Sequence, residues 1–184
     1  MSMPAALDRY YTRDEVLAFP DDANRYELVY GELLVRPSPV VSHQLVVGRL
    51  FASLHSYVER YAVGRAFMSP ADLSWGREDV IVQPDVFVVS PANARASQWE
   101  AMRRFHLFVE VLSPSTARYD RFTKRRLYQE MQVPLYWLID LARRQAEVWT
   151  PGASTPGYEE RRLVWEPDGA SEAFAMELAE LFAP

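Results

Sequence analysis

Apolar residues recur along the chain with two different periods. Residues 42–64, SHQLVVGRLFASLHSYVERYAVG, place them at helical spacing, which predicts a long helix that Ser42 caps and Gly64 ends. Residues 116–132 predict a second helix. Residues 26–36, YELVYGELLVR, predict a hairpin that turns at Tyr30 and Gly31. Short apolar runs predict further strands, at residues 79–90, 106–113, 135–141 and 145–150, and residues 65–75 predict another with a break at Pro70.

Helices and strands are mixed along the whole length, without a repeat or a linker. The chain has 184 residues, enough for one domain with a substantial core. We therefore expect residues 1–184 to form one α+β domain built on a mixed sheet with flanking helices.

The bulk composition limits the function classes. The formal net charge of −5 argues against a dedicated, high-affinity nucleic-acid binder, although an enzyme can still touch nucleic acid locally and briefly. The absence of cysteine excludes thiolate metal sites. No apolar run approaches the roughly 20 residues that cross a membrane, and the first residues lack a signal-peptide pattern. These features predict a cytoplasmic protein without a membrane partner.

Two carboxylates interrupt otherwise apolar strands. Asp85 lies in VIVQPDVFVV and Glu110 in LFVEVL. If the two strands are neighbours, the side chains can stand together, and a divalent cation such as Mg²⁺ or Mn²⁺ would relieve their repulsion. Alternatively, each acid caps a loop or pairs with an arginine.

Five motifs follow one another over about residues 12–150: YELVYGELLVRPSP, SHQ, VQPDVFVV, FVEVLSPST and VPLYWLID. Their order gives the chain a resemblance to the Uma2 endonuclease family (domain of unknown function 820). It implies a restriction-endonuclease-like fold whose PD…(D/E)xK signature binds a metal ion and cuts a phosphodiester. Asp85 and Glu110 would then be catalytic metal ligands, helped by the Val111 carbonyl group.

The third position of that signature departs from the family pattern, because Leu112 stands where the lysine is expected. Lys124 is the single lysine among 20 basic residues, and a compact ammonium can do what a planar guanidinium cannot. We therefore predict that Lys124 is a displaced catalytic lysine. The alternative is a surface pair with Asp120, one turn earlier on an exposed helix.

Further residues are candidates for supporting roles. The wider superfamily implies one more acid from the N-terminal part that completes the metal site. Glu32 or Glu27 could be this catalytic metal ligand, unless both lie on a solvated hairpin face. Gln83 would share the strand face of Asp85 and orient a water or a phosphate. His43 would contact a phosphate or water, or else lie on the surface. Asp120 is a further supporting candidate.

Arginines surround Lys124 on the predicted helix. A local positive patch there would hold a phosphate backbone despite the acidic balance, and the alternative is a solvated helix face. The residues predicted to bind nucleic acid are Arg118, Arg121 and Arg125.

The sequence thus predicts an endonuclease that uses Mg²⁺ or Mn²⁺ and acts on nucleic acid, with DNA as the expected substrate and a weak or transient contact. The alternative is a non-catalytic interaction or regulatory module that keeps the nuclease fold, which the missing strand lysine favours. The aromatic strands LYWLID and EVWT leave a packed core and a homodimer face both open.

Overall fold

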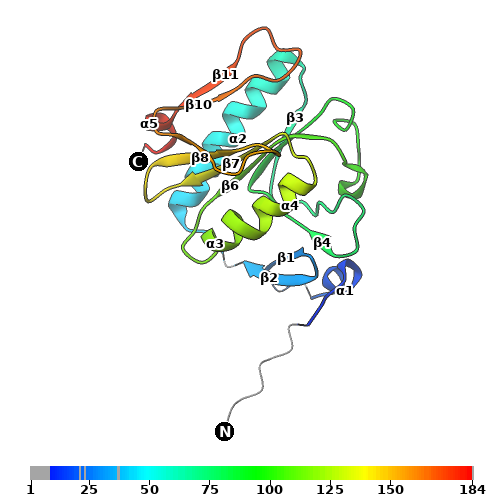
Figure 1. Cartoon of the computed structure of the whole chain (residues 1–184). Helices are drawn as coiled ribbons and strands as arrows, with labels where there is room; N and C mark the ends of the chain where they lie inside the picture. The colour runs from blue at the N-terminus through cyan, green and yellow to red at the C-terminus, as the bar shows by residue number, and fades with distance from the viewer. Residues whose placement is uncertain (1–8, 21, 23, 37, 184) are drawn as a thin grey trace.

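A six-stranded mixed sheet forms the centre of the computed structural model, which describes residues 9–20, 22, 24–36 and 38–183 (Figure 1). The strand order is β3-β5-β6-β7-β8-β9; β6 and β7 run parallel and the other neighbours antiparallel. Together with the flanking helices this confirms the predicted α+β class. The strands are β3 (Arg65–Met68), β5 (Val86–Val89), β6 (Phe105–Val111), β7 (Leu135–Asp140), β8 (Gln145–Trp149) and β9 (Gly157–Glu159).

Two smaller sheets flank the central one. The first has the order β2-β1-β4 and the second pairs β10 with β11. The predicted hairpin is present, and its turn residues Tyr30 and Gly31 have φ values of 54° and 78°, as a two-residue turn between twisted strands requires. The strands are β1 (Arg25–Val29), β2 (Glu32–Arg36), β4 (Val80–Ile81), β10 (Arg162–Trp165) and β11 (Phe174–Glu177).

The helices differ greatly in length. The short α1 (Arg13–Leu17) begins with a reciprocal capping box between Thr12 and Glu15. Within the described part of the chain, no helix is long and apolar enough to cross a membrane. The others are α2 (Val41–Tyr61), a 3₁₀ turn (Trp99–Ala101), α3 (Ala117–Tyr119), a π-helical turn (Asp120–Lys124), α4 (Arg125–Glu130) and α5 (Leu178–Leu181).

Both predicted ends of the long helix α2 are wrong. The helix begins after Val40 without a side-chain cap, so Ser42 lies inside its first turn. It ends at Ala62, which adopts the left-handed conformation at φ 53°. Gly64 serves another purpose, because a Cβ atom there would lie 2.3 Å from the Val89 carbonyl oxygen. The glycine therefore allows the chain to pass close to β5.

The run 79–90, predicted as one strand, is divided between two sheets. Its first part is β4 of the three-stranded sheet and its second part is β5 of the central sheet. Pro84 lies in the bend between them, where it needs no ladder hydrogen bond. The Ser69 hydroxyl group contacts the Gln83 and Pro84 carbonyl oxygens at 2.9 and 2.6 Å. The bend places Asp85 immediately before β5.

Alternate side chains of the central strands enter two different cores. Val109 and Val111 of β6 pack with apolar side chains of α2. Phe108 and Leu112 pack on the other face with Leu127 of α4, and Figure 1 shows α2 and α4 on opposite sides of the sheet. Because strand side chains alternate, Glu110 points to the α4 side.

Candidate active site

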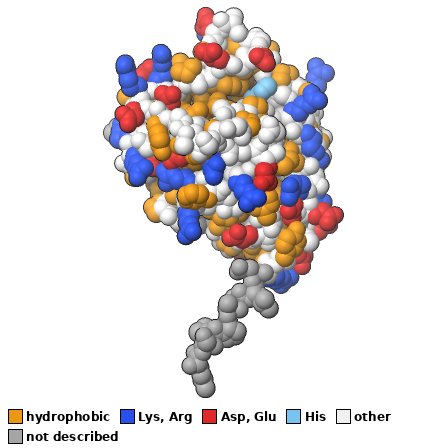
Figure 2. Space-filling model, viewed as in Figure 1, with side chains coloured by type: hydrophobic (Ala, Val, Ile, Leu, Met, Phe, Trp, Pro, Cys, Tyr) orange, Lys and Arg blue, Asp and Glu red, His pale blue; other side chains and the backbone are white. Residues whose placement is uncertain are grey.

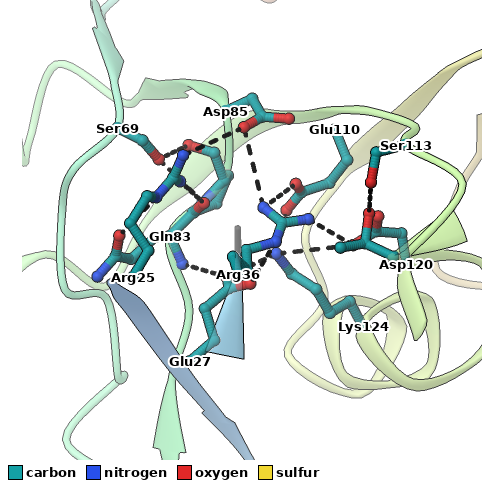
Figure 3. Close-up of polar contacts among 12 residues, drawn as sticks. Arg25, Glu27, Arg36, Ser69, Gln83, Asp85, Glu110, Ser113, Asp120 and Lys124 are labelled. Carbon is teal, nitrogen blue, oxygen red and sulfur yellow. Dashed lines mark hydrogen bonds and ion pairs between the residues drawn. The ribbon is translucent and has the colours of Figure 1, made fainter. Parts of the chain in front are cut away.

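Four carboxylates and two cations meet where the central sheet, the hairpin and the π-helical turn come together (Figure 3). Every side chain of the group is buried. Since isolated buried charges are costly, they are stable here only because they pair with one another. We call this group the charged cluster; it consists of Glu27, Arg36, Asp85, Glu110, Asp120 and Lys124.

The two strand carboxylates stand opposite each other, as their positions predict. Val86 pairs with Val109 across β5 and β6, so the preceding Asp85 faces the following Glu110. Both carboxylates contact the same atom, Nη1 of Arg36, at 3.9 Å from Asp85 Oδ1 and 3.2 Å from Glu110 Oε2. Both alternatives predicted from the sequence are therefore present: the two acids are adjacent, and an arginine pairs with them.

The two oxygens of Asp85 have different surroundings. Oδ2 accepts the Val111 backbone N–H at 2.9 Å and lies 3.2 Å from His43 Nε2. Oδ1 lies 3.9 Å from the guanidinium groups of both Arg25 and Arg36. Burial opposes ionisation, but the His43 hydrogen bond and the Arg36 charge outweigh it and hold the pKa of Asp85 at about 2.

Arg36, the last residue of β2, is the centre of the cluster (Figure 3). Besides its Nη1 contacts, its Nε lies 3.1 Å from Glu27 Oε2 and its Nη2 donates to Asp120 Oδ1 at 3.0 Å. One guanidinium group therefore touches all four carboxylates. Burial acts against this charge, but the surrounding carboxylates raise the pKa of Arg36 above its usual range, so it remains a cation.

Lys124 reaches the same carboxylates from the π-helical turn. Its side chain is fully buried, its Nζ lies 2.7 Å from Glu27 Oε1, and it also forms an ion pair with Glu110. Asp120 is farther away, at 4.0 Å. The alternative pair with Asp120 is therefore present, but it lies in the buried cluster and not on an exposed helix surface. Burial lowers the pKa of Lys124, but Glu110 and Glu27 outweigh that effect and the net shift is upward.

The cluster contains more negative than positive groups. Four carboxylates against two cations leave two carboxylates without a full counter-charge, and two of the acids have raised pKa values. Burial raises the pKa of Glu110 to about 8 and also raises the pKa of Asp120. Burial favours protonation of Glu27 as well, but Lys124 and Arg36 outweigh it and lower the pKa. Protonation of Glu110 offsets part of this excess charge, and a further cation could take the place of the proton.

The raised pKa of Glu110 predicts a loss of stability at higher pH. Burial raises the pKa of Glu110 to about 8 from the ordinary 4.5, so the folded protein binds this proton more tightly than the unfolded chain does. This contribution is complete below pH 4.5 and disappears as the pH rises through 8. In urea titrations without metal, the free energy of unfolding should therefore fall between pH 5 and 8, by on the order of a few kcal/mol.

A Glu110→Gln variant is the control for this pH dependence, because glutamine imitates the protonated acid and cannot titrate. Its free energy of unfolding should change much less over the same range. Parallel curves for the two proteins would contradict the assignment of the titrating proton to Glu110.

Of the two hairpin acids, Glu27 joins the cluster and Glu32 does not. The two share a hairpin face, as expected, but Glu32 is exposed near the turn while Glu27 is buried. The backbone N–H of Gln83 also donates to Glu27 Oε1 at 2.6 Å. The expected orienting role of the Gln83 side chain does not fit its position, because its amide donates to Asp72 at 2.8 Å.

The predicted arginine patch is partly occupied by internal contacts. Arg121 binds Glu147 at 2.6 Å and Asp140 at 2.8 Å, and Arg125 lies over the Trp149 ring. Arg118 is exposed. On the face shown in Figure 2, basic and acidic side chains are interspersed rather than segregated.

A cavity of about 590 Å³ opens beside the cluster. Asp85 and Arg36 belong to its wall, so the buried charges border space that a ligand can enter. Leu112, at the signature position of the missing lysine, also lines it. Other wall residues include Arg25, His43, Ser115 and Arg121.

Two members of the site were not among the candidates from sequence. Arg36 shares the hairpin face of Glu27, since alternate residues of paired strands face the same way, and that alternation is the signal that could have found it. Tyr128 donates its hydroxyl hydrogen bond to Glu110 Oε1 at 3.1 Å. It lies one turn after Lys124, next to apolar residues whose helical spacing indicates an ordinary core-packing face.

The comparison with family models now bears on this geometry. The model described as "Uma2: Putative restriction endonuclease" matches residues 13–179, most of the chain. The chain belongs to the Uma2 family. Membership confirms the resemblance of the motifs and extends it beyond residue 150, into the C-terminal strands.

A solved Uma2-like structure supports the fold. It is a putative nuclease belonging to DUF820 from Anabaena variabilis ATCC 29413, and it superimposes with a TM-score of 0.74. The match covers 93% of this chain and 97% of that chain at 23% sequence identity. At that identity the likeness establishes a shared nuclease-like fold. No curated protein matches the chain.

The metal ion that the family pattern implies would find suitable oxygen atoms here. Carboxylates are ligands that Mg²⁺ and Mn²⁺ prefer, and within the described part of the chain the ion-pair partners of Asp85 Oδ1 lie 3.9 Å away. The Val111 carbonyl points to the same side of β6 as its N–H, which faces Asp85. Among the described residues, however, no three His, Asp or Glu side chains converge on one point as a ready ligand set. Arg36 lies between the two carboxylates.

Proposed function

We propose that this Uma2 protein is a metal-dependent endonuclease that hydrolyses phosphodiester bonds in nucleic acid, with DNA as the substrate. The observation that carries the proposal is the pair formed by Asp85 and Glu110, opposed across two strands, with Lys124 in contact with Glu110. An acidic pair with an adjacent ammonium is suited to hydrolysis at a phosphate, and the cavity gives a substrate access to Asp85.

Asp85 and Glu110 would hold a divalent cation, which activates a water molecule and offsets charge on the phosphate when it is bound. The chain's own groups prepare this chemistry. The Val111 N–H and His43 orient Asp85, while Tyr128 orients Glu110. Lys124 would stabilise the negative charge that develops on the phosphate, since its contacts with Glu27 and Glu110 hold it as a fixed donor.

The cavity wall supplies groups that suit a phosphate backbone. Arg25 and Arg121 both line it and are only partly buried, and Ser113, Ser115 and Thr116 add hydroxyl groups. Contacts of this kind position a nucleic acid without reading its bases. The acidic overall balance supports a weak or transient encounter rather than tight binding.

The decisive experiment is a cleavage assay with Mn²⁺ or Mg²⁺ on single-stranded DNA, double-stranded DNA and RNA. We expect cleavage of DNA by the parent protein and a loss of at least about 10²–10³-fold in Asp85→Asn, which removes a charge that the cation needs. Asp79→Asn is the matched control. Asp79 belongs to the same stretch of chain but pairs with Arg77, outside the cluster, and its variant should cut normally.

A non-catalytic module remains the second candidate, favoured by one observation. Arg36 and Lys124 already satisfy much of the acidic charge without a metal ion. Such a module would bind no nucleic acid productively. Full-length protein that binds Mn²⁺ through Asp85 yet cuts none of the three substrates would support this candidate over the nuclease.

A further inference from the structure

Arg36 occupies the position that a bridging cation needs. Its Nη1 lies 3.2 Å from Glu110 Oε2 and faces Asp85 Oδ1 at 3.9 Å. An ion that takes the same Glu110 oxygen at the roughly 2.1 Å typical of Mg²⁺ would be at most about 5 Å from this nitrogen. Two cations so close in a buried site repel strongly. The guanidinium and the ion therefore compete for the same pair of carboxylates.

The surroundings of Arg36 allow its side chain to move away from Asp85 and Glu110 into the cavity. Arg36 is at the end of β2, and its side chain borders the cavity of about 590 Å³. Its contact with Glu27 Oε2 is an ion pair without hydrogen-bond alignment, and its contact with Asp85 is long. Its hydrogen bonds to Glu110 at 3.2 Å and to Asp120 at 3.0 Å are the contacts that a cation must replace. Lys124 retains Glu27 and Glu110 when Arg36 turns away. The cluster therefore loses one counter-ion without losing both.

We propose that Arg36 is an exchangeable internal counter-ion: it holds Asp85 and Glu110 in a metal-free resting state, and a divalent cation must displace it into the cavity to bind. This inference rests on the proposed function, since it concerns the same carboxylates. It assigns to Arg36 control over how tightly the site binds metal. The resting protein is stabilised by the same interaction that weakens its affinity for the cation.

The test is calorimetric titration of metal-free protein with MnCl₂, a binding readout that needs no cleavage. We expect Arg36→Gln to bind Mn²⁺ about tenfold or more tightly than the parent, because a competing positive charge is gone. Arg77→Gln is the matched control. Arg77 pairs with Asp79 outside the cluster and is not among the residues that line the cavity, so its loss should leave the affinity within about twofold.

The outcomes separate this inference from the function on which it rests. If the parent binds Mn²⁺ and Asp85→Asn does not, the metal site stands. An unchanged or weaker affinity in Arg36→Gln would then overturn the role of Arg36 alone. If Mn²⁺ binds neither to the parent protein nor to Arg36→Gln, the metal site and the role of Arg36 are both overturned.

A second measurement covers the case in which Arg36→Gln does not fold. In the parent protein, the side-chain Nε–H signal of Arg36 can be followed by NMR while diamagnetic Mg²⁺ is added. Displacement predicts a large shift or broadening of this signal, while the Nε–H signal of Arg121, held by Glu147 at 2.6 Å, stays in place. An Arg36 signal that is unchanged at saturating Mg²⁺ would overturn the inference.

Discussion

Replacing Lys124 with methionine is expected to lower the free energy of unfolding by about 3–5 kcal/mol, the usual cost of removing one partner from a buried ionic network. Methionine has a similar length, so the change removes the charge more than the volume. Glu27 and Glu110 would remain fully buried with Arg36 as their only cation in the cluster. Urea unfolding at pH 7.5, followed by circular dichroism, measures the loss.

Arg126→Met is the matched control on the same stretch of helix. Arg126 pairs with Glu130, but the two side chains are 73% and 41% exposed. An exposed pair contributes little, so this variant should lose less than about 1 kcal/mol. Similar small losses in both variants would show that the Lys124 ammonium is not held in the cluster.

Replacing Lys124 with arginine is expected to reduce cleavage by about 10²–10³-fold while the protein still folds. The positive charge is retained, but a planar guanidinium cannot place a single donor where the ammonium stands. The larger group must also fit a fully buried space, which should lower the free energy of unfolding by about 1–3 kcal/mol. A lysine on an exposed helix would tolerate the same change with almost no loss.

The rate is to be measured on a DNA that the parent protein cuts, at a temperature where thermal melting shows both proteins to be folded. A role in the transition state predicts a lower kcat with little change in KM. Cleavage close to that of the parent would leave Lys124 as a structural counter-ion, and Leu112 would then have no replacement for the lysine of the signature.

The sequence was most informative where local rules decide the structure. The hairpin turn and the alternation of β6 follow from neighbouring residues, and the structure has them as expected. The position of Asp85 opposite Glu110 needed one further assumption, that their strands are adjacent. It could be made because two acids interrupted two apolar runs.

The rest depends on contacts between residues far apart in the chain. Arg36 and Glu110 are 74 positions apart, and Lys124 and Glu27 are 97 positions apart. Periodicity cannot show that a lysine in an arginine-rich helix is fully buried, because its partners come from other elements. The division of residues 79–90 was hidden for a similar reason: both halves are apolar, and only sheet pairing separates them.

That division makes the bend at Val82–Asp85 a joint between two sheets. Glu27 and Arg36 belong to the three-stranded sheet, Glu110 belongs to the central sheet, and Asp85 lies on the joint itself. The ion pairs of the cluster thus fasten the hairpin to the central sheet. The free energy of local opening of the hairpin, as amide hydrogen exchange would report it, is therefore governed by the same charges as the chemistry of the site.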